Sequence, residues 1–332
     1  MIITRSPMRI TLGGGGTDLP SFYSEHVGFV LSMAINKYFY SVISQRDDNK
    51  IQVISSDFKS MEVLDKQEID KFTLEIPKVV MKQFDIQRGC NIFLSSEIPS
   101  GTGLGSSGSV MVNLIKSFSV FNAIELSKKE VAELACYLEM DVMGAPVGKQ
   151  DQYIAAYGGI QNFIFQKDGT VEVSELTIPN NIKKELENNI LIFYTGLRRD
   201  SSTILKEQKK RSQKTTEHMQ FIKDLGIKSR DALMSGDLTK FAELMKEHWE
   251  HKKKLVGGIT NEKIDKLYNL GISSGALSGK LLGAGGGGFL LFYTDKNHEK
   301  IRKEMSVEGL SELDIKIDND GVKTIINTLE VR

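Results

Sequence analysis

Three glycine-rich segments, far apart in the sequence, carry the residues best suited to chemistry. They read RITLGGGGTD at 9–18, PSGTGLGSSGS at 99–109 and GAGGGG at 283–288. The middle segment leads into a predicted helix that begins near Ser106, so its backbone amides and the positive end of the helix would surround an anion such as a phosphate. Its serines add hydroxyl groups. This combination predicts a phosphate-binding loop, although glycine runs also form tight turns and hinges.

Two familiar nucleotide-binding motifs do not fit these segments. The pattern GxGxxG, which is typical of dinucleotide binding, occurs at Gly103 and again at Gly283. The first occurrence has no strand-end acid about 20 residues later, and the second leads into a strand, FLLFYTD, instead of a helix. The 99–109 segment also lacks the Gly-Lys-Ser/Thr ending of a Walker loop. The residues therefore indicate a phosphate-binding loop of another type.

Three acidic residues stand where they could assist phosphate chemistry. Asp151, in GKQDQYIAAYGG, could accept a proton from an attacking hydroxyl group, but an Asp beside glycine is also common in turns and helix caps. Glu139, near the end of a predicted helix, could be a metal ligand or a solvated surface acid. Asp18 closes the first glycine segment and offers two acceptor oxygens to a hydroxylated ligand.

The patterning of the chain places these residues near the ends of strands and helices. Alternating apolar residues predict strands, and apolar residues at intervals of three and four predict helices. The capping box Ser127-Lys-Lys-Glu130 marks the start of one helix. The expected strands are 27–35, 38–44, 51–55, 190–196, 289–293, 314–317 and 322–326, and the expected helices are about 108–121, 128–141, 201–225 and 297–305, with two more capped by Asp237 and Asn261.

Length and composition are typical of a globular protein with two domains. The chain has 332 residues, of which 40% are hydrophobic and 26% charged. The elements restart with an apolar strand at Ile190, so we expect domains at 1–188 and 189–332. Lys and Arg total 43, as do Asp and Glu, and this balance favours neither nucleic acid nor an anionic membrane as a partner.

Other features of the sequence indicate a cytoplasmic protein. Cys90 and Cys136 lack the number and spacing of a disulfide framework or a zinc site, so we expect them in the core. The start, MIITRSPMRI, lacks the segments of a signal peptide, and no long uncharged apolar run predicts a membrane span. His248 and His251 lie in a stretch rich in Lys and Glu, so we expect them on the surface. No feature specifies an oligomeric state.

The three glycine segments, in this order, resemble the motifs of the GHMP kinases, the superfamily of galactokinase, homoserine kinase, mevalonate kinase and phosphomevalonate kinase. The middle segment matches the Pro-x3-Gly-Leu-Gly-Ser-Ser loop of that superfamily, and KLLGAGGGGFLLF matches its third motif. The resemblance spans essentially the whole chain. It implies an α+β fold, with a left-handed β-α-β unit in an N-terminal domain, a ferredoxin-like C-terminal domain and a site between them.

The resemblance also implies roles for individual residues, with ATP and Mg²⁺ as cofactors. Asp151 would activate the acceptor hydroxyl group, and Arg9 would be the neighbouring cation that favours its ionised form. Ser107 and Glu139 would hold the magnesium ion. The residues that would surround the ATP phosphates are Pro99, Gly101, Gly103, Leu104, Gly105, Ser106, Ser107 and Gly108.

The first motif bears on the identity of the acceptor. Galactokinase-like members carry a Glu-His pair where this chain has Gly15-Gly16, while Thr17-Asp18 is retained. The first motif and the segment around Asp151 most resemble those of bacterial D-glycero-D-manno-heptose 7-phosphate kinases. That resemblance implies phosphorylation of the anomeric hydroxyl group to the 1,7-bisphosphate, on the route to a GDP-activated heptose for surface glycans such as lipopolysaccharide or capsule.

An acceptor that already carries a phosphate group requires cations in its binding pocket. Arg198 and Arg199 are the expected phosphate ligands, with Lys149 and Lys280 behind them. The residues expected on the acceptor side are Gly15, Gly16, Thr17, Asp18, Arg198, Arg199, Gly285 and Gly286.

Three alternatives remain open from the sequence. The acceptor could be an unphosphorylated sugar, as in a fucokinase-like or galactokinase-like enzyme. The chain could instead be a GHMP-fold sugar sensor, although a sensor needs neither a base nor a complete metal site. A nucleotide-binding interaction module would account for the glycine loops but would leave the acids without a role.

Overall fold

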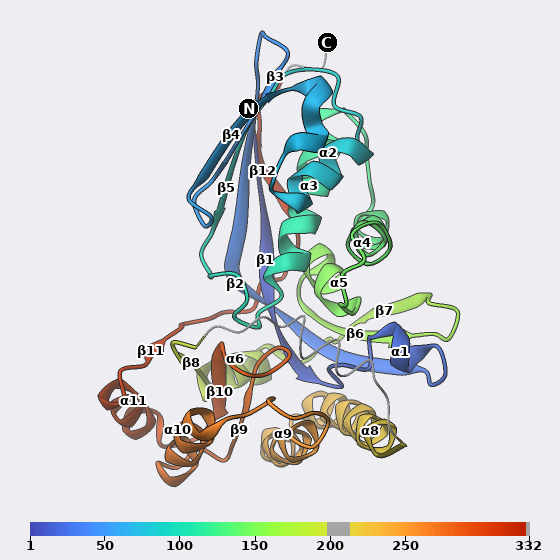
Figure 1. The fold of residues 1–332 in the computed structure, drawn as a ribbon. Helices are drawn as coiled ribbons and strands as arrows, with labels where there is room; N and C mark the ends of the chain where they lie inside the picture. Colours follow the sequence, from blue (N-terminus) through green and yellow to red (C-terminus); the bar gives the residue numbers. More distant parts are fainter. Residues whose placement is uncertain (198–212, 330–332) are drawn as a thin grey trace.

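The computed structural model describes residues 1–197 and 213–329 (Figure 1). The strands are β1 (Ile2–Gly13), β2 (Gly28–Gln45), β3 (Lys50–Ser55), β4 (Ser60–Asp65), β5 (Cys90–Ser96), β6 (Ile160–Phe165), β7 (Val171–Glu175), β8 (Ile190–Tyr194), β9 (Ser278–Leu281), β10 (Phe289–Tyr293), β11 (Ser311–Glu312) and β12 (Lys323–Asn327). The helices are α1 (Pro20–Tyr23), η1 (Lys66–Lys71), α2 (Glu75–Gln83), α3 (Ser106–Phe121), α4 (Lys128–Cys136), η2 (Tyr137–Val142), α5 (Gln150–Tyr157), α6 (Asn180–Asn189), α8 (Gln213–Ser235), α9 (Leu238–Lys252), α10 (Glu262–Ser273) and α11 (His298–Val307).

The larger sheet is organised around the long strand β2. Its main order is β12-β1-β2-β5-β3-β4, and β6, which also pairs with β7, joins the other half of β2. β3 and β5 run parallel, while β1 runs antiparallel to β2 along nearly its whole length. Alternate residues of β3, including Ile51 and Val53, are buried, as expected for a strand with one face on the core. This sheet carries the first glycine segment at the end of β1.

Helices α2 to α5 cover one face of the larger sheet (Figure 1). The expected helix at 108–121 is confirmed, and it begins two residues earlier, at Ser106, directly after the second glycine segment. Met111, Leu114 and Phe118 are fully buried against the sheet. The predicted capping box at Ser127 is also present and starts α4. Packing of α3 therefore fixes the second glycine segment against the sheet.

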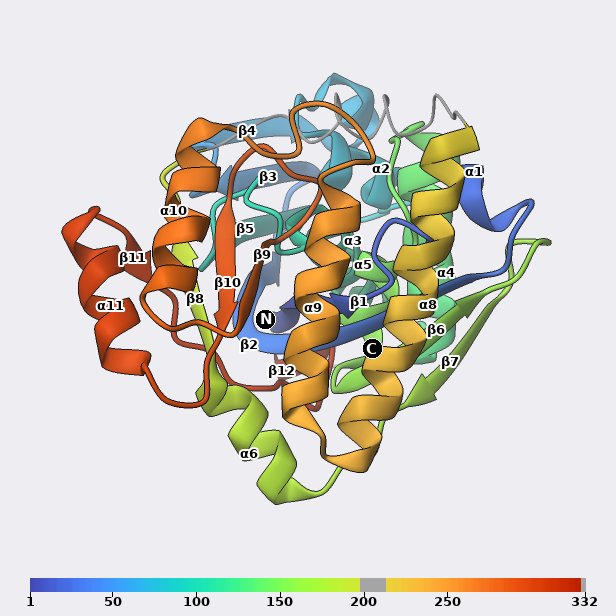
Figure 2. The ribbon, with the colours of Figure 1, turned by 90° about the horizontal axis from the view of Figure 1, so that it is seen from below.

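A smaller antiparallel sheet, in the order β11-β8-β10-β9, forms the other part of the molecule. Its core contains Trp249 of α9, Phe292 of β10 and Ile264 of α10. The third glycine segment lies between β9 and β10. Figure 2 shows α8 and α9 side by side in front of β1 and β2 of the larger sheet. The fold thus brings the third segment towards the first two.

Helix α8 contacts the first glycine segment directly through backbone. A Cβ atom on Gly226 would lie 2.7 Å from the amide nitrogen of Gly14, and one on Gly13 would lie 2.8 Å from the Cα atom of Gly226. Real side chains do not tolerate such distances. These glycines therefore allow close approach between α8 and the loop after β1.

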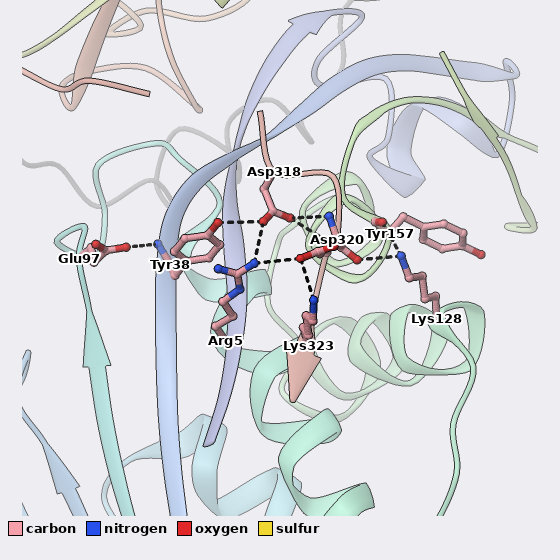
Figure 3. A network of polar contacts seen from close by, with 9 residues as sticks. Arg5, Tyr38, Glu97, Lys128, Tyr157, Asp318, Asp320 and Lys323 are labelled. Carbon is pink, nitrogen blue, oxygen red and sulfur yellow. Dashed lines mark hydrogen bonds and ion pairs between the residues drawn. The ribbon is translucent and has the colours of Figure 1, made fainter. Parts of the chain in front are cut away.

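The end of the chain returns to the larger sheet, where β12 pairs with β1. Figure 3 shows the polar contacts around this returning segment. The hydroxyl group of Tyr38 donates to Asp318 at 2.9 Å, and Arg5 donates to Asp320 at 3.0 Å. Lys128 donates to the backbone carbonyls of Asp320 and Tyr157, both at 2.8 Å. This network fastens the returning segment to β1, β2 and the helix layer.

The expected strand at 314–317 is wrong. Only Ile317 makes an isolated bridge, with Ile35. The amide of Lys316 donates to the side chain of Asn36 at 2.6 Å, and the amide of Ile317 donates to Glu187 at 2.7 Å. Side chains thus bind the backbone groups that a neighbouring strand would otherwise bind.

Two further expectations concern burial and membranes. Cys90 and Cys136 are free and buried, as expected. No helix in the described ranges is both long and apolar enough to cross a membrane.

Removal of the Asp318 carboxylate should destabilise the fold. Asp318 accepts hydrogen bonds from Tyr38 and from the amides of Asp320 and Gly321, so Asp318→Ala leaves three donors without their partner. We expect the free energy of unfolding, measured by urea denaturation, to fall by about 2–3 kcal/mol. Asp314→Ala, at an exposed position in the same segment, is the control. Equal losses in the two variants would contradict a specific role for the network.

Candidate active site

The three glycine segments meet at a cleft of about 190 Å³. Its walls come from β1 and the loop after it, the loop before α3, the start of α5, the end of α9, and β9 with its following loop. The second and third segments touch through backbone, because a Cβ atom on Gly283 would lie 2.4 Å from the Cα atom of Gly103. One on Gly288 would lie 2.1 Å from the carbonyl oxygen of Thr102. The glycines thus permit contacts that no other residue type would allow.

Arg9 and Asp151 form a two-pronged ion pair at the centre of the cleft. The Nε and Nη2 atoms of Arg9 donate to the two carboxylate oxygens of Asp151 at 2.7 and 2.9 Å. Nη1 donates to the carbonyl oxygen of Gly103 at 2.6 Å. The Asp151 side chain is 26% exposed and that of Arg9 only 8%, so the carboxylate remains accessible from the cleft.

Glycines of the second segment make room for this ion pair. A Cβ atom on Gly105 would lie 3.0 Å from Cγ of Arg9, and one on Gly108 would lie 2.8 Å from Cβ of Asp151. Gly101, Gly103 and Gly105 all have positive φ angles, from 74 to 88°. The loop therefore needs glycine both for its backbone conformation and for its contacts.

The other predicted phosphate-loop residues have different surroundings. Ser106 and Ser107 line the cleft at the first turn of α3. Leu104 is fully buried, and its carbonyl oxygen accepts a hydrogen bond from the amide of Arg9 at 2.9 Å. The carbonyl oxygen of Pro99 accepts from the hydroxyl group of Thr102 at 2.7 Å. Leu104 and Pro99 thus hold the shape of the loop, whereas the serines face the cleft.

Ser107 and Glu139 lie in direct contact. The hydroxyl group of Ser107 donates to one carboxylate oxygen of Glu139, and Nε2 of Gln152 donates to the other at 2.6 Å. Glu139 lies on η2, a π-helical turn that continues α4, and is only 2% exposed. Burial raises the pKa of its carboxyl group, and the two hydrogen bonds oppose this shift.

This oxygen pair has the chemistry of a magnesium site. Mg²⁺ prefers hard oxygen ligands and is usually held by one or two carboxylates together with phosphates and waters. A buried carboxylate beside a hydroxyl group at the mouth of a phosphate loop fits that requirement. Within 1–197 and 213–329 there is no cluster of three or more His, Cys, Asp or Glu that could hold a metal ion.

Asp18 is buried at the edge of the cleft and firmly held. It accepts hydrogen bonds from the amides of Gly16 and Gln150 at 3.1 and 3.2 Å, and from Nε2 of Gln150 at 3.1 Å. Burial raises the pKa of its carboxyl group, the charge of Asp151 adds to this effect, and the backbone hydrogen bonds oppose it. Gly148 is required here, because a Cβ atom would lie 2.0 Å from an Asp18 oxygen.

The remaining residues of the first glycine segment divide into two groups. Gly15 and Gly16 line the cleft. The hydroxyl oxygen of Thr17 instead lies 2.8 and 2.7 Å from the carbonyl oxygens of Gly14 and Phe29, either of which can accept its hydrogen bond. Thr17 is fully buried, so the geometry favours a structural role for it.

Other expected acceptor residues lie away from the cleft surface. Gly285 packs against Ile259, and the amide of Gly286 donates to the carbonyl oxygen of that residue at 2.8 Å. From the same segment, Gly283 and Ala284 line the cleft instead. Lys149 donates to the carbonyl oxygen of Gly169 and lies over the ring of Tyr23. Arg198 and Arg199 lie outside the described residues.

The wall formed by α9 and β9 contains one residue that the sequence analysis misplaced, one that it missed, and Lys280, which it expected near the acceptor phosphate. His248 was expected on the surface, but it is 4% exposed and lines the cleft, so that expectation is wrong. Lys252, one turn later, and Lys280 line the same wall. A signal was present in the sequence: His248 and Lys252 continue the apolar spacing of Phe241 and Leu244 along one helix face.

The environment of this wall lowers the pKa of all three groups. Desolvation lowers the pKa of Lys252 to about 7, and the nearby charge of Arg9 contributes. Desolvation also lowers the pKa of Lys280 well below its ordinary value, with Lys252 and Arg9 adding to the effect. The pKa of His248 is lowered by burial and by both lysines. The wall therefore places two lysines and a histidine in a desolvated environment that disfavours their charged forms.

The cleft combines a glycine loop at a helix start, an adjoining hydroxyl and carboxylate pair, and an accessible Asp paired with Arg, an arrangement suited to a phosphotransferase. Residues 71–159 match the model of the GHMP kinases N terminal domain, and residues 229–309 match that of the GHMP kinases C terminal domain. The chain belongs to the GHMP kinase family, and its fold is the GHMP kinase fold.

Several sugar kinases are similar to nearly the whole of this chain. The D-glycero-alpha-D-manno-heptose 7-phosphate kinase of Campylobacter jejuni is 32% identical over 97% of this chain and 98% of its own length. The bifunctional fucokinase/GDP-fucose pyrophosphorylase of Arabidopsis thaliana is 29% identical over 94% of this chain and 32% of that protein. A crystal structure described as a D-glycero-D-manno-heptose 1-phosphate kinase from Bacteriodes thetaiotaomicron superposes with a TM-score of 0.84 at 25% identity, over 99% of this chain and 100% of that one.

The lowered pKa of Lys252 predicts a pH-dependent contribution to stability. Between its folded pKa of about 7 and the ordinary value of 10.5, the unfolded chain binds one more proton at this position than the folded chain. Stability of the wild type should therefore rise with pH across this interval. Relative to the wild type, Lys252→Met should be most stabilised below pH 7 and less so towards pH 10.

Urea denaturation at several pH values measures this difference. Lys246→Met, at an exposed position of the same helix, is the matched control. A difference between wild type and Lys252→Met that does not vary with pH would contradict the assignment.

Proposed function

We propose that the protein is an ATP- and Mg²⁺-dependent sugar kinase that phosphorylates the anomeric hydroxyl group of D-glycero-D-manno-heptose 7-phosphate. The product would be the 1,7-bisphosphate, an intermediate for GDP-heptose and surface glycans. The observation that carries this proposal is the 32% identity, over nearly the full length of both chains, to a heptose 7-phosphate kinase. The accessible Asp151 beside Arg9 supports it with the required catalytic geometry.

Phosphoryl transfer depends mainly on positioning and on neutralising charge. The amides at the start of α3 would hold the ATP phosphates, with the helix N-terminus adding a favourable field. Ser107 and Glu139 would hold the magnesium ion, which neutralises phosphate charge when bound. A buried carboxylate such as Glu139 gains most from a nearby cation, because desolvation disfavours its charge.

Asp151 would orient the acceptor hydroxyl group and accept its proton. Its two oxygens both bind Arg9, yet a carboxylate has about four acceptor positions, so two remain for a substrate. Arg9 fixes the rotamer of Asp151 and joins it to the phosphate loop through Gly103. The base and the phosphate donor thus share one rigid support.

The acceptor would lie between the first glycine segment and α9. Gly15 and Gly16 leave room where galactokinase-like enzymes carry larger side chains, which suits a seven-carbon sugar. Asp18 lines the same region and would bind sugar hydroxyl groups. The family resemblance implies that Gly285 and Gly286 also line the acceptor site. Their contacts with Ile259 favour a structural role in the loop between β9 and β10 instead.

An unphosphorylated sugar is the alternative acceptor. The Arabidopsis relative is named as a fucokinase, and it aligns with 94% of this chain. Lys252 and Lys280 favour a phosphorylated acceptor instead, because a phosphate group would stabilise their charged forms in the desolvated wall, whereas a neutral sugar would not.

A panel of acceptors tests the proposed function. With ATP and Mg²⁺, release of ADP should be at least about 100-fold more efficient, as kcat/KM, with heptose 7-phosphate than with heptose, fucose or galactose. Phosphorus NMR of the product should place the new phosphate on the anomeric oxygen. Preference for a sugar without phosphate would refute the proposal, and absence of turnover with every sugar would favour a sensor.

Replacement of Asp151 tests the catalytic assignment. Asp151→Asn keeps the shape of the side chain but removes the proton acceptor, so kcat should fall by about 10²- to 10⁴-fold. Affinity for an ATP analogue, measured by calorimetry, should change little, and a melting curve checks that the variant remains folded without the charge partner of Arg9. Asp224→Asn, at an exposed position on α8, is the control. A near-wild-type kcat would remove Asp151 from the mechanism.

A further inference from the structure

Backbone carbonyl groups hold two lysines on the wall formed by α9 and β9. Nζ of Lys280 donates to the carbonyl oxygens of Thr11 and Leu12 at 2.6 and 3.0 Å. Nζ of Lys252 donates to the carbonyl oxygens of Leu281 and Gly283, the first at 3.1 Å. An ammonium group has three N–H donors. Each lysine therefore keeps one donor for a ligand in the cleft.

Neither ammonium group forms an ion pair with a carboxylate in the part of the chain that the structure describes. Arg9, the third cation here, differs because it is neutralised by Asp151. Placing unpaired ammonium groups in a desolvated wall is costly, and their lowered pKa values reflect that cost. An anion bound between them would offset it.

His248 adds an unpartnered polar side chain to the same wall. Both ring nitrogens are buried, and neither has a hydrogen-bond partner among the described residues. His248 is only 4% exposed, and it lines the cleft one helical turn before Lys252. A buried nitrogen without a partner is destabilising unless a ligand satisfies it.

We propose that Lys252, Lys280 and His248 form the subsite that binds the phosphate group of the acceptor sugar. A phosphate monoester offers three acceptor oxygens, which matches two free ammonium donors and one imidazole donor. This proposal deepens the proposed function and rests on it for the identity of the sugar.

The position of the lysines favours the phosphate of the acceptor over the phosphates of ATP. Lys280 is anchored on Thr11 and Leu12, in the strand that leads into the acceptor loop. The loop at the start of α3 already provides amides for the ATP phosphates. The charge of Arg9 contributes to the lowered pKa of both lysines, and Arg9 also donates a hydrogen bond to Asp151. The lysines and Asp151 therefore lie near the same residue. One sugar could place a hydroxyl group at Asp151 and its phosphate at the lysines.

Steady-state kinetics of Lys252→Met at saturating ATP test the proposal. Loss of one charged hydrogen bond should raise the KM for heptose 7-phosphate about 10- to 100-fold. The KM for unphosphorylated heptose and the KM for ATP should change less than about threefold. Lys246→Met, an exposed lysine on the same helix, should match the wild type. Lys252→Arg should restore part of the affinity, and His248→Leu should weaken binding of the phosphorylated sugar selectively.

Two kinetic outcomes would overturn the subsite. Unchanged KM for heptose 7-phosphate in both Lys252→Met and His248→Leu would exclude a role in binding the acceptor. A similar fall in kcat with phosphorylated and unphosphorylated acceptors would assign the lysines to the phosphoryl group being transferred. A melting curve for each variant separates these results from loss of the fold.

Calorimetry with inorganic phosphate separates failure of the subsite from failure of the proposed function. An ATP analogue with Mg²⁺ first occupies the loop before α3, and phosphate is then titrated into the protein. Wild type should bind phosphate at least about tenfold more tightly than Lys252→Met. This result would support the subsite even if the enzyme did not use heptose 7-phosphate, and equal affinities would overturn the subsite whatever the sugar.

Discussion

The bidentate pair between Arg9 and Asp151 is the interaction on which the cleft depends. Arg9 comes from the first strand of the chain, Asp151 from the first turn of α5, and the third Arg9 contact is the carbonyl oxygen of Gly103. A planar guanidinium group can make these contacts at once, whereas an ammonium group cannot. One side chain thus sets the relative positions of the sheet, the phosphate loop and the helix that carries the proposed base.

Close packing around the cleft explains why several positions are glycine. Gly105 and Gly108 are bare because Arg9 and Asp151 occupy the space that their side chains would fill. Gly283 and Gly288 are bare because the third segment lies against the backbone of the second. The same close packing excludes water from the α9 wall and lowers the pKa of Lys252 and Lys280. Burial disfavours the charged forms of Lys252 and Lys280, and we infer that an anionic substrate would stabilise those forms.

Local patterns in the sequence predicted much of the fold and the polar centre of the site. The helix at Ser106 and the capping box at Ser127 depend on nearby residues, and both are present. The structure also brings Arg9 to Asp151 and Ser107 to Glu139, as the family resemblance implied. Their roles in catalysis remain predictions.

Long-range contacts decided the features that the sequence did not predict. The 314–317 segment has strand-like alternation, but side chains of Asn36 and Glu187 bind its amides. His248 looked like a surface residue because its sequence neighbours are charged, yet its helix face packs towards β9. Likewise, nothing local in the sequence indicates that Thr17 turns away from the cleft to bind Phe29.

A double-mutant cycle on Arg9 and Asp151 tests the central claim most directly. The kcat is measured for the wild type, Arg9→Met, Asp151→Asn and the double variant. If the pair acts as one unit, the double variant should be within about threefold of the slower single variant. Effects that multiply, so that the double variant loses the product of the two single losses, would contradict the account.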